Sequence, residues 1–220
     1  AYRDSDLIVS LLTEQLGMVS ALARTARKSQ RRFGGALEPM HTLRVDLEES
    51  GHRELLTLRE ATLSTPRRHL VADLDRMAAA GRALAWVRRA APERTPEPAV
   101  WRVLCELLDR LDDPHDDRST ALHLAECGLR LLAAFGWGID FERCVVSGVA
   151  CEPGRAAMVD PARGGLVSRA SGGAPFRLAG APRERLARAA AEQPESLIEP
   201  DVPIALRLVE EALRAHVGVE

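Results

Sequence analysis

Hydrophobic and polar residues alternate most regularly over residues 41–48, in the sequence HTLRVDLE. Leu43, Val45 and Leu47 fall on one side of this alternation, and polar or charged residues fall on the other. A period of two is typical of a strand that buries one face and leaves the other in water. Other apolar runs predict further strands over residues 6–13, 18–24 and 54–63. Several short strands in succession favour a small β-barrel.

After Pro66 the spacing of apolar residues changes to that of amphipathic helices. Leu70 and Leu74 begin a series in which apolar residues recur every three or four positions. Pro98 lies near the start of one such segment and Gly136 follows the end of another, as expected at helix termini. The predicted helices span residues 67–90, 98–111, 120–135, 182–192 and 201–216.

The stretch between the third and fourth of these helices has a different character. Residues 144–175 are rich in Gly and irregular, with short strand-like pieces at 157–160 and 165–169. The sequence therefore predicts an α+β chain of two domains. A β-barrel domain is expected over residues 1–65, and a helical domain that carries the irregular insertion is expected over 66–220.

Composition places the chain among ordinary globular proteins. It has 220 residues, of which 46% are hydrophobic and 28% charged, and its formal net charge is −2. No apolar run approaches the roughly 18 residues of a membrane-spanning helix, and no signal peptide opens the chain. Four cysteines are too few for a disulfide scaffold in a chain of this length. We therefore expect a cytoplasmic protein without membrane contact.

Against this near-neutral background, one segment is strongly basic. Between Glu14 and Glu38 there is no acidic residue, and five cations fall within nine positions of this gap. Because the segment follows a predicted strand, we expect a loop beside the barrel whose positive field attracts a phosphate backbone. Arg44, on the polar face of its strand, is a weaker candidate for the same surface. The five cations are Arg24, Arg27, Lys28, Arg31 and Arg32.

Aromatic residues, which stack on nucleobases, are scarce in the same region. Only Tyr2 and Phe33 precede Trp86, and Phe33 is expected to pack in the core. Such a surface would hold nucleic acid mainly through phosphates, with weak sequence preference and strong salt dependence. The alternative is a solvated loop that binds nothing. Further basic groups are expected on helix surfaces, where one or more of them would extend the binding surface; they are Arg67-Arg68, Arg88-Arg89 and the series Arg183, Arg185 and Arg188.

Signs of catalysis or of a bound metal are weak. Cys144-Val-Val-Ser-Gly is similar to half of a zinc knuckle with one thiolate replaced. Cys151 is nearby in sequence, but no second pair or adjacent His completes a four-ligand site. There is no P-loop, no nucleophile elbow and no His in a constellation suited to general base catalysis. We expect no enzyme activity, no cofactor and no metal.

Three segments carry motifs in a recognisable order. The first is RDSDLIVSLLTEQLGMVSALARTARKSQRR at residues 3–32, where a strand leads through a Gly to a second strand and the basic loop. The second is LRLLAAFGWGIDFERCVVSG at 129–148, with a helix end, a Gly turn and a cysteine-bearing knuckle. The third is the stretch Gly164-Gly165-Leu-Val-Ser. In this order and spacing they resemble the RecO family of bacterial recombination mediators, and the resemblance extends over essentially the whole chain.

The resemblance implies an N-terminal OB-fold followed by a helical domain with a small zinc-ribbon-like insertion. It implies a role in DNA repair by homologous recombination. Such proteins bind single- and double-stranded DNA, anneal complementary strands and help load RecA onto DNA coated by single-strand binding protein. The implied partners are DNA, RecR, the C-terminal tail of single-strand binding protein and, indirectly, RecA. A further strand before Ala1 and a basic tail after Glu220 are also implied, outside this sequence.

Three positions depart from the family pattern. Thr25 stands where the family usually has Gly in the basic loop, so the shape of that loop is expected to differ. Ser147 and Ser168 stand where zinc-bearing members have Cys, and Cys144 alone remains. The insertion is therefore expected to lack most of the metal ligands.

Two other interpretations remain open. One is an RNA-binding OB-fold protein without a role in recombination, although the scarcity of stacking aromatics disfavours sequence-specific reading of RNA. The other is a metal-dependent enzyme built around Cys144 and Cys151.

Overall fold

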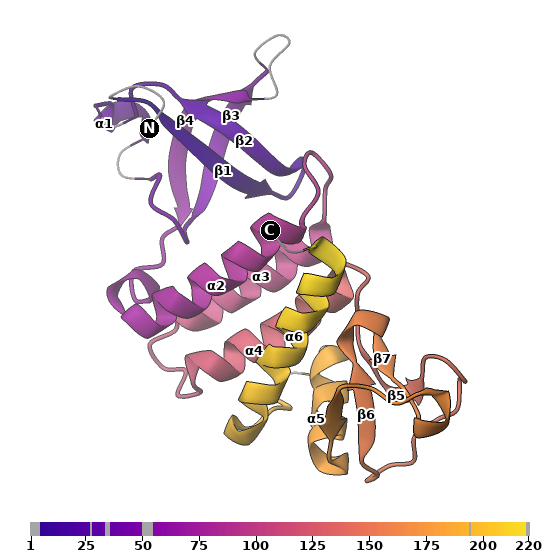
Figure 1. Ribbon diagram of the computed structural model, residues 1–220. Coiled ribbons are helices and arrows are strands. Elements are labelled where there is room, and N and C mark those ends of the chain that lie inside the picture. The colour runs from indigo at the N-terminus through magenta and orange to yellow at the C-terminus, as the bar shows by residue number, and fades with distance from the viewer. Residues whose placement is uncertain (1–4, 27, 34–35, 50–54, 194, 219–220) are drawn as a thin grey trace.

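The computed structural model describes residues 5–26, 28–33, 36–49, 55–193 and 195–218. Figure 1 shows a sheet built from the N-terminal residues, a layer of helices next to it and a second, smaller sheet beside the last helices. Among the described residues, none of the helices combines the length and apolar character needed to cross a bilayer.

The N-terminal sheet is made of two hairpins. Its strands are β1 (Leu7–Thr13), β2 (Gly17–Ala23), β4 (Leu56–Thr65) and β3 (Thr42–Glu48), in that spatial order. β1 pairs with β2 and β3 pairs with β4 in antiparallel fashion, whereas only two parallel residue pairs join β2 to β4. Within the part of the chain that the structure describes, no ladder joins β3 to β1.

The expected closed barrel is therefore not formed, and the N-terminal sheet is open. Alternation of apolar and polar residues predicts individual strands, but it does not determine whether the two edges of a sheet meet, since closure depends on strand number, tilt and stagger together. The four predicted strands themselves are present, each within two residues of its expected start or end. The OB-fold implied by the resemblance remains a prediction.

A small apolar core covers one face of this sheet. Alternate residues of β2 are buried in it, including Val19 and Ala21, and Leu58 enters it from β4. The short helix α1 (Gln30–Phe33) lies within the segment expected to be a loop. Its Phe33 is only 2% exposed and closes the core, so this ring packs, as predicted.

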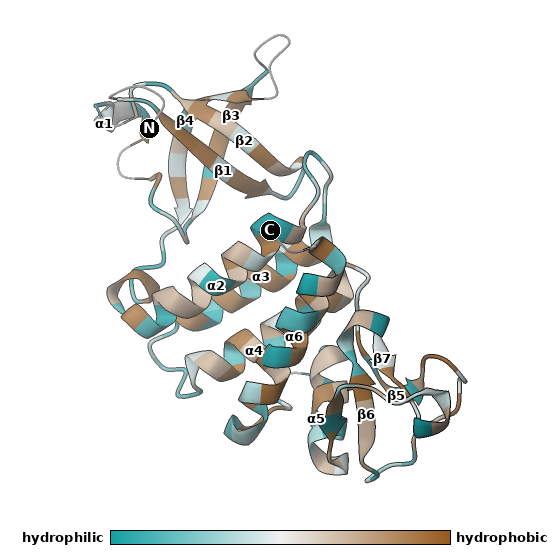
Figure 2. Ribbon diagram, viewed as in Figure 1, coloured by the Kyte–Doolittle hydropathy of each residue, from teal (hydrophilic) through white to brown (hydrophobic). Residues whose placement is uncertain are grey.

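The helical part is arranged around one central helix. Its helices are α2 (Leu74–Ala90), α3 (Pro98–Asp112), α4 (Thr120–Ala134), α5 (Gly180–Ala190) and α6 (Val202–Val217). α4 packs against all four of the others, and its residues are buried on most sides. Gly128 allows α6 to approach α4 closely, because a Cβ at this position would lie 3.0 Å from the methyl groups of Val209. Figure 2 shows polar residues on the outer surface of α6.

Side-chain caps set the start of two of the five long helices, α2 and α4. The Asp73 carboxylate accepts hydrogen bonds from the backbone N–H groups of Asp75 and Arg76, and α2 begins at the next residue. The expected start at residue 67 was therefore too early, and Leu70–Ala72 forms a 3-10 turn instead. Ser119 caps α4 in the same way, by accepting from the N–H of Leu122 at 3.1 Å.

The stretch expected to be irregular folds into a second sheet. Its strands are β5 (Asp140–Cys144), β7 (Gly165–Leu166), β6 (Ala157–Asp160) and β8 (Phe176–Leu178), in that spatial order. Phe141, Val159 and Leu178 bury one face of this sheet in the core shared with the helices. The C-terminal part is therefore not purely helical. Its zinc-ribbon-like character remains a prediction.

A buried arginine joins the N-terminal sheet to the helices. Arg67 is 2% exposed and donates from Nε and Nη2 to the Asp109 carboxylate of α3, at 3.0 and 2.7 Å. Its Nη1 donates to the Met40 carbonyl and to the Thr42 hydroxyl, next to β3. This single side chain therefore fixes the base of the sheet on the helical layer.

Candidate nucleic-acid interface

The basic segment leaves the end of β2 and returns to the sheet through α1. Arg24 and Lys28 are exposed, and Arg32 is half-buried. Arg27 lies outside the described residues, and so does the side chain of Arg31. The structure thus places two of the predicted cations on the surface and a third in contact with the loop itself.

A turn at Thr25 sets the direction of the loop. Its φ of 54° lies in the left-handed region, which a β-branched residue rarely adopts. The Thr25 N–H donates to Asp6 Oδ1 at 2.8 Å, and the Thr25 carbonyl accepts from the N–H groups of Lys28 and Ser29. Because Gly adopts this φ without strain, the bond to Asp6 explains how the turn tolerates Thr.

Arg32 braces the same turn from the other side. Its Nε donates to Ser29 Oγ at 3.1 Å, and its Nη2 donates to the Arg24 carbonyl at 2.9 Å and to Thr25 Oγ1 at 2.5 Å. Its guanidinium also lies over the Phe33 ring, 5.2 Å from the ring centroid. Arg32 therefore holds the backbone that presents Arg24, and only its remaining N–H groups are open to a ligand. Sequence spacing did not reveal this positioning role.

The surface of the loop carries charge that no described carboxylate neutralises. Among the residues that the structure describes, Arg24, Lys28 and Arg32 form no ion pair; the nearest pairs in sequence are Arg59–Glu48 and Arg94–Glu49. The Asp6 carboxylate is buried and accepts from a backbone N–H at the base of the loop. The field of the exposed cations is thus available to an anion in solution.

Arg44 has different surroundings. It is exposed on β3, and the same polar face of that strand carries Asp46 and Glu48. Glu48 pairs with Arg59 of β4. The apolar residues of β3 point to the opposite face, where α1 closes the core. The structure therefore places Arg44 on a face of mixed charge and does not bring it together with the cations of the loop.

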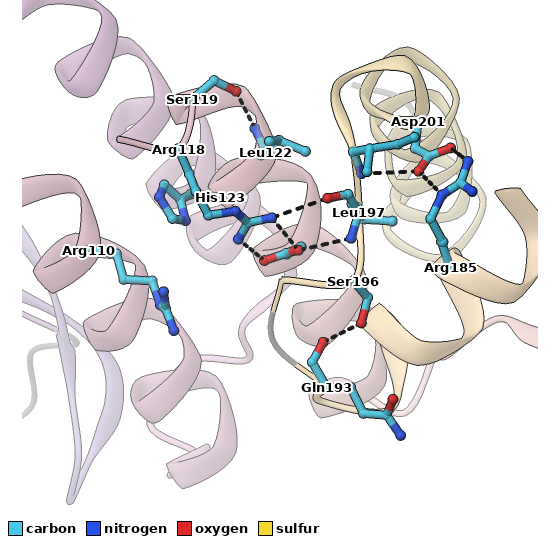
Figure 3. Close-up of polar contacts among 12 residues, drawn as sticks. Arg110, Arg118, Ser119, Leu122, His123, Arg185, Gln193, Ser196, Leu197 and Asp201 are labelled. Carbon is cyan, nitrogen blue, oxygen red and sulfur yellow. Dashed lines mark hydrogen bonds and ion pairs between the residues drawn. The ribbon is translucent and has the colours of Figure 1, made fainter. Parts of the chain in front are cut away.

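Ten of the 21 arginines that follow Pro66 form an ion pair with a described carboxylate. Arg118, which Figure 3 labels, donates from both terminal nitrogens to the Glu126 carboxylate, at 3.0 and 2.9 Å. Burial raises the pKa of Glu126, but hydrogen bonds from Arg118 and from the Leu197 N–H outweigh it, so the pKa lies below its ordinary value. Arg185 likewise holds Asp201 by two bonds, at 2.6 and 2.7 Å (Figure 3).

Two arginines that were expected on helix surfaces are buried instead. Arg67 joins the sheet to the helices, as described above, and Arg183 is 3% exposed. The guanidinium of Arg183 donates to the backbone carbonyls of Phe141, Glu152 and Arg155. The prediction that these groups lie on helix surfaces is therefore wrong for Arg67 and Arg183, because each satisfies carbonyl groups inside the fold. Arg68, Arg88, Arg89 and Arg188 are exposed.

The knuckle in the second sheet contains one thiol and three hydroxyls, at Cys144, Ser147, Ser168 and Ser171. The Ser168 N–H donates to Cys144 Sγ at 3.3 Å, and the hydroxyl oxygens of Ser168 and Ser171 are 2.9 Å apart. Hydrogen bonds from the Ser147 hydroxyl and the Ser168 backbone lower the pKa of Cys144 to about 5.

This donor set does not fit structural zinc, which is held by four ligands drawn mainly from Cys and His. The hydroxyls of Ser168 and Ser171 bond to each other, and Cys144 Sγ lies 3.8 Å from Ser171 Oγ. A hydrogen-bonded cluster thus stands where a zinc knuckle would bind its ion. Sequence reasoning missed Ser171 as the fourth member of this cluster, although its position three residues after Ser168 repeats the spacing of Cys144 and Ser147.

The interpretation as a metal-dependent enzyme finds no support in the geometry. Within the described ranges, no three His, Cys, Asp or Glu side chains converge as metal ligands. Cys144 lies in the knuckle, whereas Cys151 packs at the edge of the helical core. Both are free thiols.

Two family models match the chain and together cover nearly all of it. The model described as "Recombination protein O N terminal" matches residues 1–67, and "Recombination protein O C terminal" matches residues 71–220. The first therefore ends at the buried Arg67, and the second contains all the larger helices.

Curated relatives carry the same description. The chain is 37% identical over 147 residues to the DNA repair protein RecO of Anaeromyxobacter sp. (strain K), a match that covers 67% of this chain and 57% of that protein. It is 36% identical over 148 residues to the DNA repair protein RecO of Geobacter metallireducens, covering 67% of this chain and 59% of that protein. The chain thus spans less than two thirds of the length of these relatives.

Proposed function

The chain belongs to the RecO family, and on that premise we propose that it acts in DNA repair by homologous recombination as a non-enzymatic DNA-binding protein. The observation that carries the proposal is the pair of exposed cations, Arg24 and Lys28, on a loop whose shape Asp6 and Arg32 hold. Preformed positive charge on a fixed backbone is what a phosphate chain of either single- or double-stranded DNA requires.

Binding in this proposal is ionic and largely independent of base sequence. Each contact from Arg24 or Lys28 to a phosphate releases condensed counterions, which supplies the affinity and makes it fall with salt. Arg27 and Arg31, whose side chains lie outside the described residues, are proposed as further phosphate contacts on the basis of sequence, and Arg44 contributes at most a weaker contact from the mixed-charge face. Strand annealing follows from the same charge, because a protein that screens two mutually repelling strands lets them pair.

The roles that involve other proteins are also proposed for this chain. They are loading of RecA onto DNA coated by single-strand binding protein, association with RecR, and docking of the tail of single-strand binding protein. The helical part, with its larger core, is the part of the chain that we assign to these contacts. No particular helix face is assigned to either protein.

The central test is a charge reversal in the loop with a matched control elsewhere. The variant Arg24→Glu/Lys28→Glu should bind a single-stranded oligonucleotide at least tenfold more weakly than the wild type. The plot of log affinity against log salt should become less steep by about 0.7 for each lost phosphate contact. Binding is measured by fluorescence anisotropy across a salt series, and annealing by the pairing rate of complementary oligonucleotides.

The control is Arg143→Glu/Arg177→Glu, which makes the same kind of charge reversal at two exposed positions of the second sheet. It should bind DNA nearly as well as the wild type. Equal losses in both variants would mean that net charge alone, and not the loop, determines binding. Thermal unfolding of both proteins checks that neither change disturbs the fold.

Lys28 offers a direct footprint, because it is the single lysine in the 220 residues. An amine-acylating reagent should modify Lys28 more slowly when DNA is bound, with the N-terminal amine as an internal reference. Unchanged modification of Lys28 under saturating DNA would place the interface elsewhere. Parallel titrations with DNA and RNA of matched length test the RNA-binding alternative, which requires tighter binding to RNA.

A further inference from the structure

Three aromatic rings form a continuous stack on the helical part. Phe135 is the C-cap of α4, Trp137 lies two residues further along the chain, and His216 lies in the last turn of α6. The ring centroids of Phe135 and Trp137 are 5.2 Å apart, and those of Trp137 and His216 are 5.1 Å apart with the ring planes only 10° from parallel. Phe135 and Trp137 are half-buried, whereas His216 is exposed.

The stack is held firmly and is open at one end. The backbone N–H of Trp137 donates to the Leu132 carbonyl at 2.8 Å, and this bond ties the turn to the end of α4. Gly136, with φ of 78°, faces open space where a side chain would begin. Trp137 stacks on both other rings, whereas His216 is exposed and, among the described rings, stacks on Trp137 alone, so His216 is the ring available to a ligand.

A turn that carries an exposed cation adjoins the segment that follows Trp137. The 3-10 turn Pro161–Arg163 packs on α6. The next residue, Gly164, adjoins the segment after Trp137, because a Cβ added at Gly164 would lie 3.6 Å from the carbonyl oxygen of Gly138. Arg163 is exposed and forms no ion pair with any carboxylate that the structure describes. Figure 1 shows that the C-terminal end of α6 is directed toward the N-terminal sheet.

We propose that the Phe135–Trp137–His216 stack is a platform for an unpaired nucleobase of single-stranded DNA, which extends the stack on the His216 ring. Arg163 binds a neighbouring phosphate of the same strand. This inference rests on the proposed DNA binding and adds a second, chemically different contact to it. It supplies the stacking surface that the N-terminal sheet, with few aromatic residues, lacks.

The geometry favours a base over a side chain of a protein partner. Nearly parallel rings with one open end reproduce the arrangement of successive bases in a strand, and every base has a flat face that can continue it. The adjacent Arg163 matches the phosphate that accompanies each base. A protein partner would need a wide apolar patch around the ring, but the exposed residues next in sequence to the stack include two glycines, Gly136 and Gly138, and the charged Arg214.

The experiment compares two strands that share the same phosphates. Anisotropy titrations use a fluorescent oligothymidine and an abasic strand of equal length, in which every nucleotide lacks its base. Wild-type protein should prefer oligothymidine by about five- to 150-fold, the range expected for one stacked base. His216→Leu, which keeps the side of Trp137 covered but removes the ring, should bind both strands equally and should leave affinity for the abasic strand unchanged. His216→Phe should restore the preference.

The outcomes separate this inference from the proposed function. If wild-type protein binds the abasic strand as tightly as oligothymidine, the stack takes no base and the inference fails while phosphate binding stands. If His216→Leu keeps the wild-type preference, stacking occurs elsewhere and the inference also fails. If neither strand binds, the proposed DNA binding itself is lost. Arg24→Glu/Lys28→Glu should weaken binding of both strands by the same factor and preserve their ratio.

Discussion

In the basic loop, Arg24 and Lys28 are exposed and no described carboxylate pairs with them, whereas in the helical part Arg118 and Arg185 each hold a carboxylate by two hydrogen bonds. Basic side chains therefore serve two purposes in this protein. Charge on the loop is available to a ligand, and charge among the helices joins segments distant in sequence. Arg32 is intermediate, since it braces the loop from within but contacts no carboxylate among the described residues.

The difference teaches that a count of basic residues says little about a binding surface. An exposed cation contributes little to stability but acts on ligands over about a Debye length. A cation that holds a buried carboxylate contributes to stability instead, because its removal leaves the carboxylate charged and buried without a partner. Substitutions in the two regions should therefore separate cleanly into loss of binding and loss of stability.

The largest effect on stability is expected at Arg185. Arg185→Met removes both bonds to Asp201, which is only 2% exposed, and should lower the free energy of unfolding by about 3 kcal/mol. Arg24→Met should change it by less than about 0.5 kcal/mol, because Arg24 has no described partner to leave unpaired. Urea denaturation monitored by circular dichroism measures both. A comparable loss of stability in the two variants would contradict the distinction between paired and exposed arginines.

A smaller effect is expected from acid, in the helical part. Because the pKa of Glu126 is lower in the folded chain than its ordinary value of 4.5, its contribution to stability is fully present above that value. It is lost as pH falls through the lowered pKa. Glu126→Gln cannot titrate, so its stability should depend less steeply on pH below 4.5 than that of the wild type. Parallel pH profiles for the two proteins would contradict this assignment.

The smallest effect is expected at the turn that begins the basic loop. Thr25→Asn should raise the free energy of unfolding by about 0.5–1 kcal/mol, because Asn tolerates the left-handed region and keeps an oxygen that can accept from Arg32. DNA affinity should not fall, since the cations keep their places. A loss of stability in a thermal melt would show that the Thr25 side chain contributes more than its strained φ costs.

Much of the architecture could be predicted from local pattern. The alternation of Leu43, Val45 and Leu47 correctly predicted β3, and helical spacing found every helix of ten residues or more. Helix starts were missed where a capping side chain such as Asp73 decided them. In the second sheet the strand-like pieces at 157–160 and 165–169 correctly predicted β6 and the place of β7, whereas β5 and the three-residue β8 were missed, because so short a strand shows no period.

The candidate site was also predictable in part, because one of its features is a local pattern in the sequence. A gap without acidic residues is visible in sequence, and it indicated the loop that carries Arg24 and Lys28. The brace at Arg32 and the bond from Thr25 to Asp6 join residues up to 19 positions apart and depend on how the strands pair. The stack of Trp137 on His216 joins residues from two helix ends and has no local signature at all.

The order of charges and apolar residues by itself determined where strands and helices form and which segment is basic without compensation, because periodicity and local charge density are properties of neighbours in the chain. Only the tertiary structure decided which arginines reach water. Arg67 and Arg183 have the same side chain as Arg24, yet they are buried, because packing surrounds them with carbonyls and carboxylates that replace their hydration. Closure of the N-terminal sheet was also decided at that level, since it depends on where distant edges meet.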